Sequence, residues 1–316
     1  MSIKKKLIKT KKRLKQRSLK QRNLKKRSFK YRSNNKISKK IGSGIEPHAD
    51  KKDIKNVFKN TTLNTDVVSV INKFVPPLLK NENIRQVVKD YLSEDENLKQ
   101  QVIKKYGPIN NWDVSRVTNM SHLFNGARSF NDDISEWDVS NVIKMEGMFG
   151  QTESFNQPLN KWNVSKVENM AGMFVKAKLF NQPLNKWDVS KVTDMDFMFF
   201  RAETFNQHLN DWDVSNVTDM TGLFFHAYNF NKPLNSWNVS KVKDMNAMFH
   251  QAEAFNQPLN NWNVSNVTNM QSMFLNAESF NQDLNDWDVS NVTDMTEMFK
   301  FAASFNIEEN AIWYNR

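Results

Sequence analysis

The pattern of hydrophobic and polar positions repeats along most of this chain with a strict period of 25 residues. The tryptophans mark the period most clearly, and eight of them share one position: Trp112, Trp137, Trp162, Trp187, Trp212, Trp237, Trp262 and Trp287. A ninth tryptophan, Trp313, comes one position later than the period requires and is out of phase. A fixed period of this length is typical of an array of stacked structural repeats.

The apolar residues that follow each tryptophan recur at helical spacing. In one unit they are Val192, Met195, Met198, Phe199 and Ala202, and this spacing predicts a short helix. The serine three residues after the tryptophan suits the N-cap of that helix. Serine occupies this place in every unit: Ser115, Ser140, Ser165, Ser190, Ser215, Ser240, Ser265 and Ser290.

The residues around each tryptophan predict a strand. Leu184, Trp187 and Val189 have the spacing L-x-x-L-x-L with tryptophan in the middle, which is the strand signature of leucine-rich repeats. Alternation along a strand would point Trp187 and Val189 inward and Asp188 outward. We therefore expect an α/β repeat, a leucine-rich-repeat-like solenoid of eight 25-residue units, each a short parallel strand plus a short helix.

Two further repeated positions are expected to be structural. The methionine eight residues after each tryptophan, such as Met195, is expected in the core rather than in a copper site. The asparagine that directly follows the last phenylalanine of each unit, such as Asn206, is expected to bond neighbouring backbone groups as an internal ladder.

Two helices are predicted ahead of the first unit. Residues 83–92 place Ile84, Val87, Val88 and Tyr91 on one apolar face. A capping box formed by the residues at 93 and 96 would start the next helix, over residues 97–106, which would bury the apolar residues at 98, 102 and 103. These helices are expected to cover the open end of the stack.

The N-terminal segment has a different composition. Residues 1–40 carry 19 Lys and Arg and no Asp or Glu, so the rest of the chain holds 45 − 19 = 26 basic and 34 acidic residues. Mutual repulsion predicts a disordered basic arm. Its candidate polyanion-binding residues are Lys12, Arg13, Lys15, Arg17, Arg22, Lys25, Lys26 and Arg27. Nucleic acid, nuclear import machinery and anionic lipid are alternative partners, and a solubilising tail without a partner is the simplest explanation.

The predicted organisation has four segments. Residues 1–44 form the disordered basic arm, 45–108 a linker and helical N-terminal cap, 109–305 the repeat solenoid and 306–316 a C-terminal cap. The chain has no cysteine, which excludes disulfides, thiolate metal sites and cysteine nucleophiles. Charges stand where a signal peptide needs its apolar core, so we expect no conventional secretion and an intracellular, nuclear or virion-associated protein.

At this point the motifs resemble a known family. WDVSNVTDM, MF-x-x-A and FNQPLN are similar to the BspA-like leucine-rich surface repeats, in the 25-residue variant also found in mycoplasma lipoproteins. The lead-in YGPINNWDVSRVTNM resembles that of protist and giant-virus members. The resemblance implies a right-handed solenoid used in binding or adhesion, and it implies no enzymatic activity.

The candidate binding face is the polar column that follows the tryptophans. Stacked strands would place these side chains about 4.8 Å apart along one face, where they would bind a protein or glycan partner or, less simply, a cation. The candidate residues are Asp113, Asp138, Asn163, Asp188, Asp213, Asn238, Asn263 and Asp288, with a basic spot at Lys161 and Lys186. A solvated face without a partner is the alternative.

No catalytic or metal-binding arrangement can be singled out. The five histidines share no repeat position and no metal-ligand spacing, and every carboxylate column is repeated. We therefore expect a non-enzymatic, monomeric interaction protein without cofactors, catalytic residues, metal or membrane span. The alternative is a nucleic-acid-associated structural protein of a virion or of chromatin, acting through the basic arm.

Overall fold

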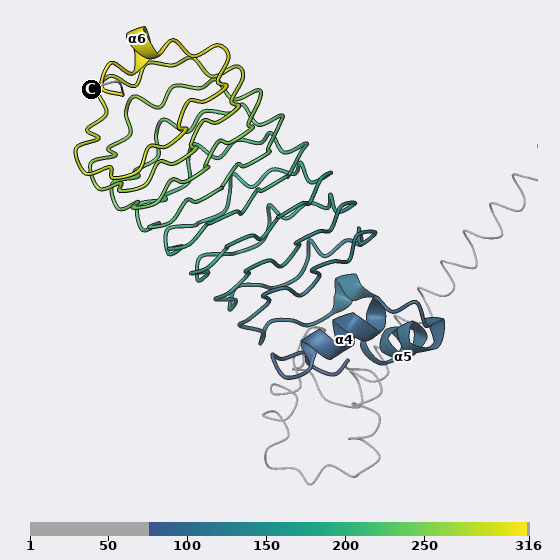
Figure 1. Cartoon of the computed structure of the whole chain (residues 1–316). Coiled ribbons are helices and arrows are strands. Elements are labelled where there is room, and N and C mark those ends of the chain that lie inside the picture. Colours follow the sequence, from purple (N-terminus) through teal and green to yellow (C-terminus); the bar gives the residue numbers. More distant parts are fainter. Residues whose placement is uncertain (1–75, 315–316) are drawn as a thin grey trace, which may run out of the picture. The chain divides into compact units, whose positions relative to one another are not determined.

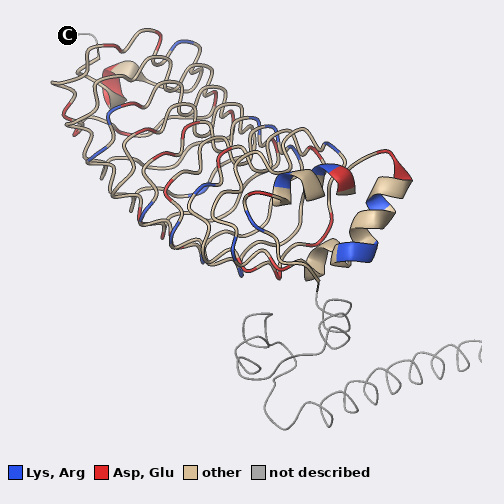
Figure 2. Ribbon diagram, turned by 90° about the horizontal axis from the view of Figure 1, so that it is seen from below, with Lys and Arg blue, Asp and Glu red and all other residues tan. Residues whose placement is uncertain are grey.

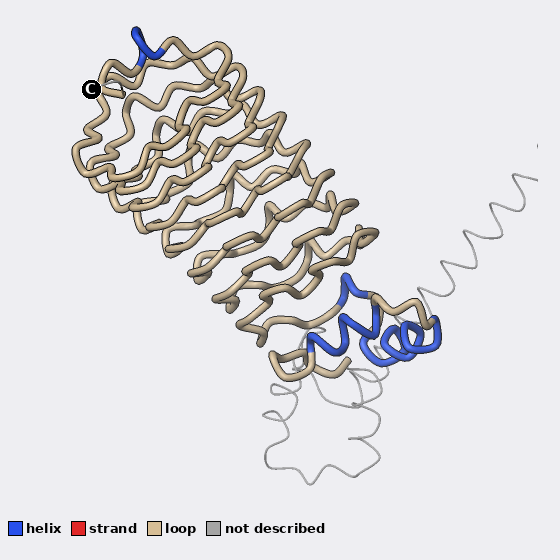
Figure 3. Tube along the Cα trace, in the orientation of Figure 1, coloured by secondary structure: helices blue, strands red, loops and turns tan. Residues whose placement is uncertain are grey.

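Successive 25-residue units lie on one another as the coils of a stack (Figure 1). The computed structural model describes residues 76–314, so the predicted basic arm and the linker up to residue 75 lie outside the described residues. In the described part, helices stand only at the two ends (Figure 3). They are α4 (Ile84–Tyr91), α5 (Glu96–Tyr106) and the short η1 (Ile109–Asn111) before the first coil, and α6 (Ile307–Asn310) after the last.

A regular hydrogen-bond pattern joins each coil to the next. In the unit of Trp187, the backbone N–H groups of Met195, Phe197, Phe199 and Arg201 each donate to a carbonyl of the following coil, at 2.7–3.4 Å. The same four bonds occur at all seven junctions between the eight units. Because the donors are alternate residues, the bonds form a ladder that runs through the stack.

The N–H groups between these donors close tight turns within the coil. Met198 donates to the carbonyl three residues earlier, and so do Phe200 and Ala202. Every backbone donor from residue 195 to 202 is thus engaged, since the remaining one, at residue 196, donates to the side chain of Asp194. This arrangement satisfies the buried backbone without a continuous helix or strand.

The structure therefore differs from the predicted unit. The expected helix over residues 192–202 is a run of turns, and the serine before it caps no helix. The expected strand at Leu184–Val189 is also a turn, closed by the bond from the Trp187 N–H to the Leu184 carbonyl. Instead, isolated parallel bridges join the position seven residues after each tryptophan: Asn119, Lys144, Asn169, Asp194, Asp219, Asp244, Asn269 and Asp294.

Aromatic columns form the core of the stack. Trp212 is 3% exposed and lies parallel to Trp187, with ring centroids 6.3 Å apart and an interplanar angle of 3°. Each tryptophan from Trp137 onward in the period donates its indole N–H to a carbonyl 28 residues earlier, at 2.8–3.2 Å. Two phenylalanine columns pack beside them, as in the 4.1 Å contact between Phe199 and Phe205. The predicted burial of tryptophan is confirmed.

The other two structural columns also match their predictions. The methionines equivalent to Met195 are buried in the first seven units, and the one in the last unit is partly exposed. The asparagines equivalent to Asn206 form the expected ladder, because each side-chain oxygen accepts the backbone N–H of the asparagine in the next coil, at 2.9–3.1 Å. The methionines therefore pack in the core, and the asparagines link neighbouring coils.

Two positions of every unit have left-handed backbone, and in the unit of Trp187 they are Phe197 and Arg201. Only four of the sixteen residues at these positions are glycine, and the others include His226. Non-glycine residues are uncommon in this region because of steric crowding at Cβ. A Cβ at Gly222 would lie 2.4 Å from the Phe197 ring of the preceding coil, so any side chain there would require this ring to move. The tight coil therefore imposes its backbone on unfavourable residue types.

The N-terminal helices agree in part with the prediction. The apolar face of α4 is buried as expected, and Tyr91 packs edge-on against Trp112 at 5.3 Å. The α5 helix begins one residue earlier than expected, and its N-cap is Asp95, which accepts the Asn97 N–H at 2.9 Å. The predicted capping box is therefore wrong. Leu98 is also 37% exposed rather than buried.

Trp313 comes one residue later than the 25-residue period requires, but the C-terminal segment still places it in the tryptophan column. The α6 helix takes up the extra residue, and Trp313 stacks on Trp287 with centroids 6.4 Å apart. Its indole N–H donates to the Leu284 carbonyl at 2.8 Å, as the other tryptophans do one coil earlier. Trp313 is thus a ninth member of the column, although it is less buried than the others.

Candidate interaction site

All eight residues of the predicted binding face are exposed along one side of the stack. Each accepts the backbone N–H of the serine two residues on, at 3.1 Å, which forms an Asx turn. Figure 2 shows charged residues of both signs spread along the coils of the described part. The column is therefore on the surface, but a local structural role already explains why Asp or Asn stands there.

The hydrogen bonds within two of these turns favour the ionised form of the carboxylate. The side-chain and backbone bonds from Ser215 hold the pKa of Asp213 below its usual range, and the bonds from Ser290 do the same for Asp288. One carboxylate oxygen in each turn is engaged with the chain itself. At the five aspartates the column offers a partner the remaining oxygen and its negative charge, and at the three asparagines it offers the side-chain amide group.

Of the two lysines in the predicted basic spot, Lys161 forms an ion pair within the stack and Lys186 has an exposed side chain. The Lys161 ammonium lies 2.5 Å from a carboxylate oxygen of Glu136 in the preceding coil, and this contact raises the Lys161 pKa. The backbone N–H of Lys186 donates to the Asn160 side chain at 3.2 Å, and the Lys186 side chain is exposed. Lys161 and Lys186 therefore do not form a shared anion site.

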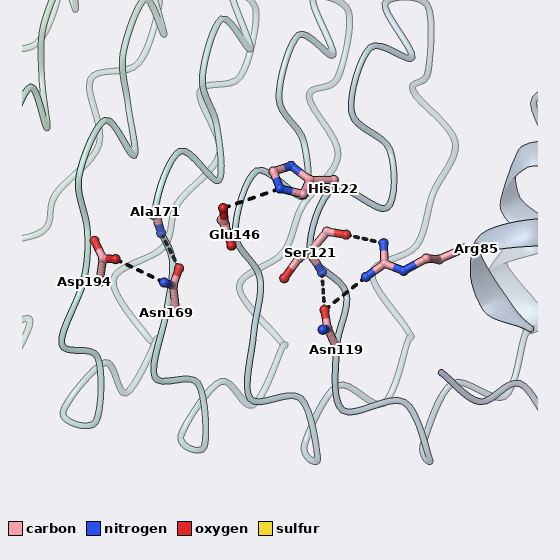
Figure 4. A network of polar contacts seen from close by, with 8 residues as sticks. All are labelled: Arg85, Asn119, Ser121, His122, Glu146, Asn169, Ala171 and Asp194. Carbon is pink, nitrogen blue, oxygen red and sulfur yellow. Dashed lines mark hydrogen bonds and ion pairs between the residues drawn. The ribbon is translucent and has the colours of Figure 1, made fainter. Parts of the chain in front are cut away.

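A second Asx column lies along the parallel bridges, and it becomes acidic in the middle of the stack. Asn169 accepts the Ala171 N–H at 3.0 Å and donates to Asp194 at 3.1 Å (Figure 4). Burial of Asp196, with Asp194 and Asp219 nearby, raises the pKa of the Asp196 carboxyl to about 7. Even so, no three His, Asp or Glu side chains of residues 76–314 are arranged to hold a metal ion.

The run of turns at residues 196–201 and its equivalents in the next two coils carry a cluster of rings that the sequence pattern did not predict. Phe200 meets Phe225 edge-on at 5.1 Å, and Phe225 stacks on His250 at 4.2 Å. Phe197 and His226 extend the cluster at 5.9 and 4.4 Å. All five side chains are partly exposed, in contrast to the buried rings of the core. We call these five residues the aromatic surface.

The imidazoles of the aromatic surface are held neutral. Burial, together with Arg201 and His250, lowers the pKa of His226 to about 4, and burial also lowers the pKa of His250. One ring nitrogen of His226 lies 2.7 Å from the Tyr228 hydroxyl. Near neutral pH the surface therefore presents uncharged rings, with the Arg201 guanidinium 5.6 Å from the Phe200 ring centroid at its border.

A signal for this surface was present in the sequence. The position that Phe200 occupies varies from unit to unit, and its members are Asn125, Gly150, Val175, Phe200, Phe225, His250, Leu275 and Lys300. It is apolar or aromatic in the central units and polar or small at the ends. The variable row used for the predicted binding face is a different one, just before each tryptophan. The positions after the tryptophan are predicted to form one helix, and this prediction does not group the rings at Phe197, Phe200 and His226.

Comparison with known proteins gives a family match. The family model described as "Mycoplasma protein of unknown function, DUF285" matches residues 96–212 and again residues 198–313. The two matches together include nearly all of the coils and α5. A search of curated proteins found no match. Within the described residues, no helix is long and apolar enough to cross a membrane.

Proposed function

We propose that this chain, which belongs to the family described as Mycoplasma protein of unknown function, DUF285, is a non-enzymatic interaction protein. In this proposal the repeated columns hold the stack together, and the aromatic surface binds a protein partner. A glycan would be recognised by the same stacking of rings and is the alternative partner at this surface.

The aromatic surface is the observation that carries the proposal. Aromatic side chains are enriched at protein interfaces, and a few of them commonly supply most of the binding energy. Phe200 and Phe225 stand at a position where other units carry Asn, Gly or Lys, so the stack itself does not require rings there. Their neighbours His226 and His250 are uncharged near neutral pH, because both have a lowered pKa, and this lowers the cost of removing water from the surface.

A matched pair of double variants tests this role. Phe200→Ala with Phe225→Ala removes the centre of the aromatic surface. Val175→Ala with Leu275→Ala removes apolar side chains from the same position of two flanking coils. Proteins captured by the wild-type chain should be lost with the first pair and retained with the second. Equal capture by both variants would contradict the proposal.

The Asp and Asn column remains a second candidate face for the partner. Its eight exposed residues present a repeated row of oxygens, which is what supports this role. Charge reversal of Asp188 and Asp213 to Lys should weaken capture if the partner uses the column. The same change to Lys at Asp138 and Asp288, which lie nearer the two ends of the stack, gives the matched variants for comparison. A loss of stability without a change in binding would assign the column to the Asx turns alone.

The basic N-terminal segment supports a second candidate function, association with nucleic acid. Its 19 Lys and Arg without a single acidic residue over residues 1–40 would release counterions from a polyanion. In this proposal the arm tethers the chain inside the cell, for example to chromatin or within a virion. DNA binding by the full chain should weaken steeply with salt, and a chain starting at residue 45 should not bind. Equal binding by both would exclude the arm.

The finer structural class is also part of the proposal. We assign the stack to the BspA-like leucine-rich repeats and to a right-handed solenoid. The parallel bridges between neighbouring coils support this assignment, although they lie seven residues after each tryptophan and not in the L-x-x-W-x-V segment, which forms a turn. An experimental structure of residues 76–316 would decide it.

A further inference from the structure

A row of aspartates lies in the same three coils as the aromatic surface. The position seven residues after the tryptophan holds Asp194, Asp219 and Asp244 in three successive coils, and we call these three residues the acidic row. Parallel bridges join Asp194 to Asp219 and Asp219 to Asp244, so the three residues are neighbours along the stack. Each of these coils also carries a ring of the aromatic surface six residues later, as Phe200 follows Asp194.

The charge of these three coils differs from that of the other coils. The segments 194–200, 219–225 and 244–250 hold four aspartates and no Lys or Arg. The equivalent segments of the other coils hold either no Asp, Glu, Lys or Arg, or charges of both signs. Among residues 76–314, no Lys or Arg forms an ion pair with the acidic row. The surface beside the rings is therefore acidic and has no bound counter-charge in the described part.

The carboxylates of the acidic row have acceptor capacity to spare. Each is partly exposed and accepts one backbone N–H from the residue two positions on, at 2.8–3.2 Å. Asn169 donates to the second oxygen of Asp194 at 3.1 Å (Figure 4), and Asn269 does the same for Asp244 at 3.0 Å. The second oxygen of Asp219, in the middle of the row, has no donor among residues 76–314.

A neighbouring carboxyl group responds to this charge. Asp196 lies two residues after Asp194 and directly before Phe197 of the aromatic surface. Burial raises the pKa of Asp196 to about 7, and the charges of Asp194 and Asp219 add to the shift. A proton on Asp196 therefore reduces the repulsion between carboxylates, and a cation supplied by a partner would reduce it in the same way.

The aromatic surface also has open space beside one of its rings. Phe197 occupies the position that is glycine in both neighbouring coils, at Gly172 and Gly222. The Phe197 ring lies over Gly222, whereas a Cβ at Gly172 would meet only the Val175 side chain within 4 Å, at 3.0 Å. A side chain from a partner can therefore enter at Gly172, next to Phe197 and Asp196.

Exposed rings beside carboxylates suit a Lys or Arg side chain. Its aliphatic stem covers apolar surface, and its charged group is attracted both by ring faces and by carboxylates. The chain already makes one such contact itself, because the Arg201 guanidinium lies 5.6 Å from the Phe200 ring centroid. At most about 22 Å of extended chain separates Asp194 from Phe200, so one short segment of a partner can reach both.

We propose that the aromatic surface binds a basic segment of the partner protein, in which apolar side chains cover the rings and Lys or Arg side chains reach the acidic row. This inference rests on the proposed function, because it specifies the chemistry of the partner at the same surface. An acidic segment would be repelled by the row. A neutral glycan would stack on the rings without using the carboxylates.

Fluorescence anisotropy with the full chain tests the inference. The probe is a fluorescein-labelled synthetic peptide in which arginine alternates with leucine and glycine, and the matched peptide has glutamine in place of every arginine. The arginine peptide should bind at least about tenfold more tightly than the glutamine peptide. Equal binding of the two peptides, or no binding of either, would overturn the inference.

A matched pair of variants places the arginine peptide on the acidic row. Asp219→Asn removes the charge and keeps an acceptor for the turn, as Asn169 does at the same position. It should weaken binding of the arginine peptide at least about fivefold. Asp294→Asn makes the same change in the last coil and should weaken binding less than about twofold. Equal affinities of the two variants would overturn the inference.

Two further results separate this inference from the proposed function. Loss of a captured partner with Phe200→Ala/Phe225→Ala but not with Asp219→Asn would overturn the inference and leave the proposed function standing. Retention of the partner by both variants would overturn both. Binding of chitohexaose in place of the arginine peptide would also overturn the inference, because it would make a glycan the partner.

Discussion

Aromatic residues are buried and regularly repeated in the interior of the stack, whereas those of the aromatic surface are partly exposed and occur in only a few coils. In the interior, tryptophan and two phenylalanines recur in every unit, lie nearly parallel to their neighbours and are almost fully buried. In the aromatic surface, Phe200, Phe225 and His250 occur in three adjacent units at a position that is Asn, Gly or Lys toward the ends of the stack. Uniform rings serve the architecture, which repeats, whereas a surface that recognises one partner does not need to repeat. In our proposal this difference separates the residues that stabilise the stack from those that bind a partner, and it can be tested at single residues.

The largest expected effect is in the interior. Trp212→Ala should lower the free energy of unfolding by about 3–5 kcal/mol, because it leaves a cavity and removes the indole bond to the Leu184 carbonyl, which then keeps only the Trp187 N–H. Trp313→Ala should cost less, because Trp313 makes the same bond but is partly exposed. Urea denaturation followed by circular dichroism measures both. An equal loss for the two variants would contradict the role of burial.

The asparagine ladder should show an intermediate effect. The Asn206 side chain accepts the Asn231 N–H, which is partly buried, so Asn206→Ala should cost about 1–2 kcal/mol. The matched change Asn163→Ala removes only an exposed Asx bond to Ser165 and should cost less than about 1 kcal/mol. Thermal melts of the two variants should keep this order. The reverse order would mean that the exposed column carries the stack.

Asp196 should make stability depend on pH. Its folded pKa of about 7 lies above the ordinary value of 3.8, so the folded state favours the protonated acid. This contribution is fully present below about pH 3.8 and is lost as pH rises through 7. Because the group is half exposed, the effect should stay below about 1 kcal/mol. Asp196→Asn should abolish this slope in melting temperatures measured from pH 4 to 8, and an unchanged slope would assign it to another group.

His226 should give a small slope of the opposite sign. Its folded pKa of about 4 lies below the ordinary value of 6.5, so stability is full above pH 6.5 and is lost as pH falls toward 4. His226→Asn keeps a residue that tolerates the left-handed backbone at φ 56° and removes the titration. Melts between pH 4 and 7 compare the variant with the wild type. If both lose the same stability, His226 is not the titrating group.

Much of the stack could be predicted from the sequence. The period, the burial of tryptophan and methionine, the asparagine ladder and the apolar face of α4 all follow from the spacing of side chains. The regular elements of the unit could not be predicted in this way. Apolar residues three apart, as at Val192, Met195 and Met198, fit a helix, but they also fit a series of turns that each close on the third residue back.

The hydrogen bonds that choose between these two structures are not local. In a helix the N–H of Phe197 would bond within its own unit, whereas here it bonds to Thr221 in the next coil. The aromatic surface was hidden for a similar reason, because Phe200 and Phe225 are 25 residues apart and become neighbours only when the coils stack. The Asp column was located correctly on the surface, but its Asx bonds became visible only with the backbone in place.

The central claim is that the irregular rings bind and the regular rings support. The most direct test is the dissociation constant for a captured partner, measured with Phe200→Ala/Phe225→Ala and with the matched Val175→Ala/Leu275→Ala. We predict at least about a tenfold weakening for the first pair and less than about twofold for the second. Equal affinities for the two pairs, with both proteins folded, would contradict the claim and would move the search to the Asp column.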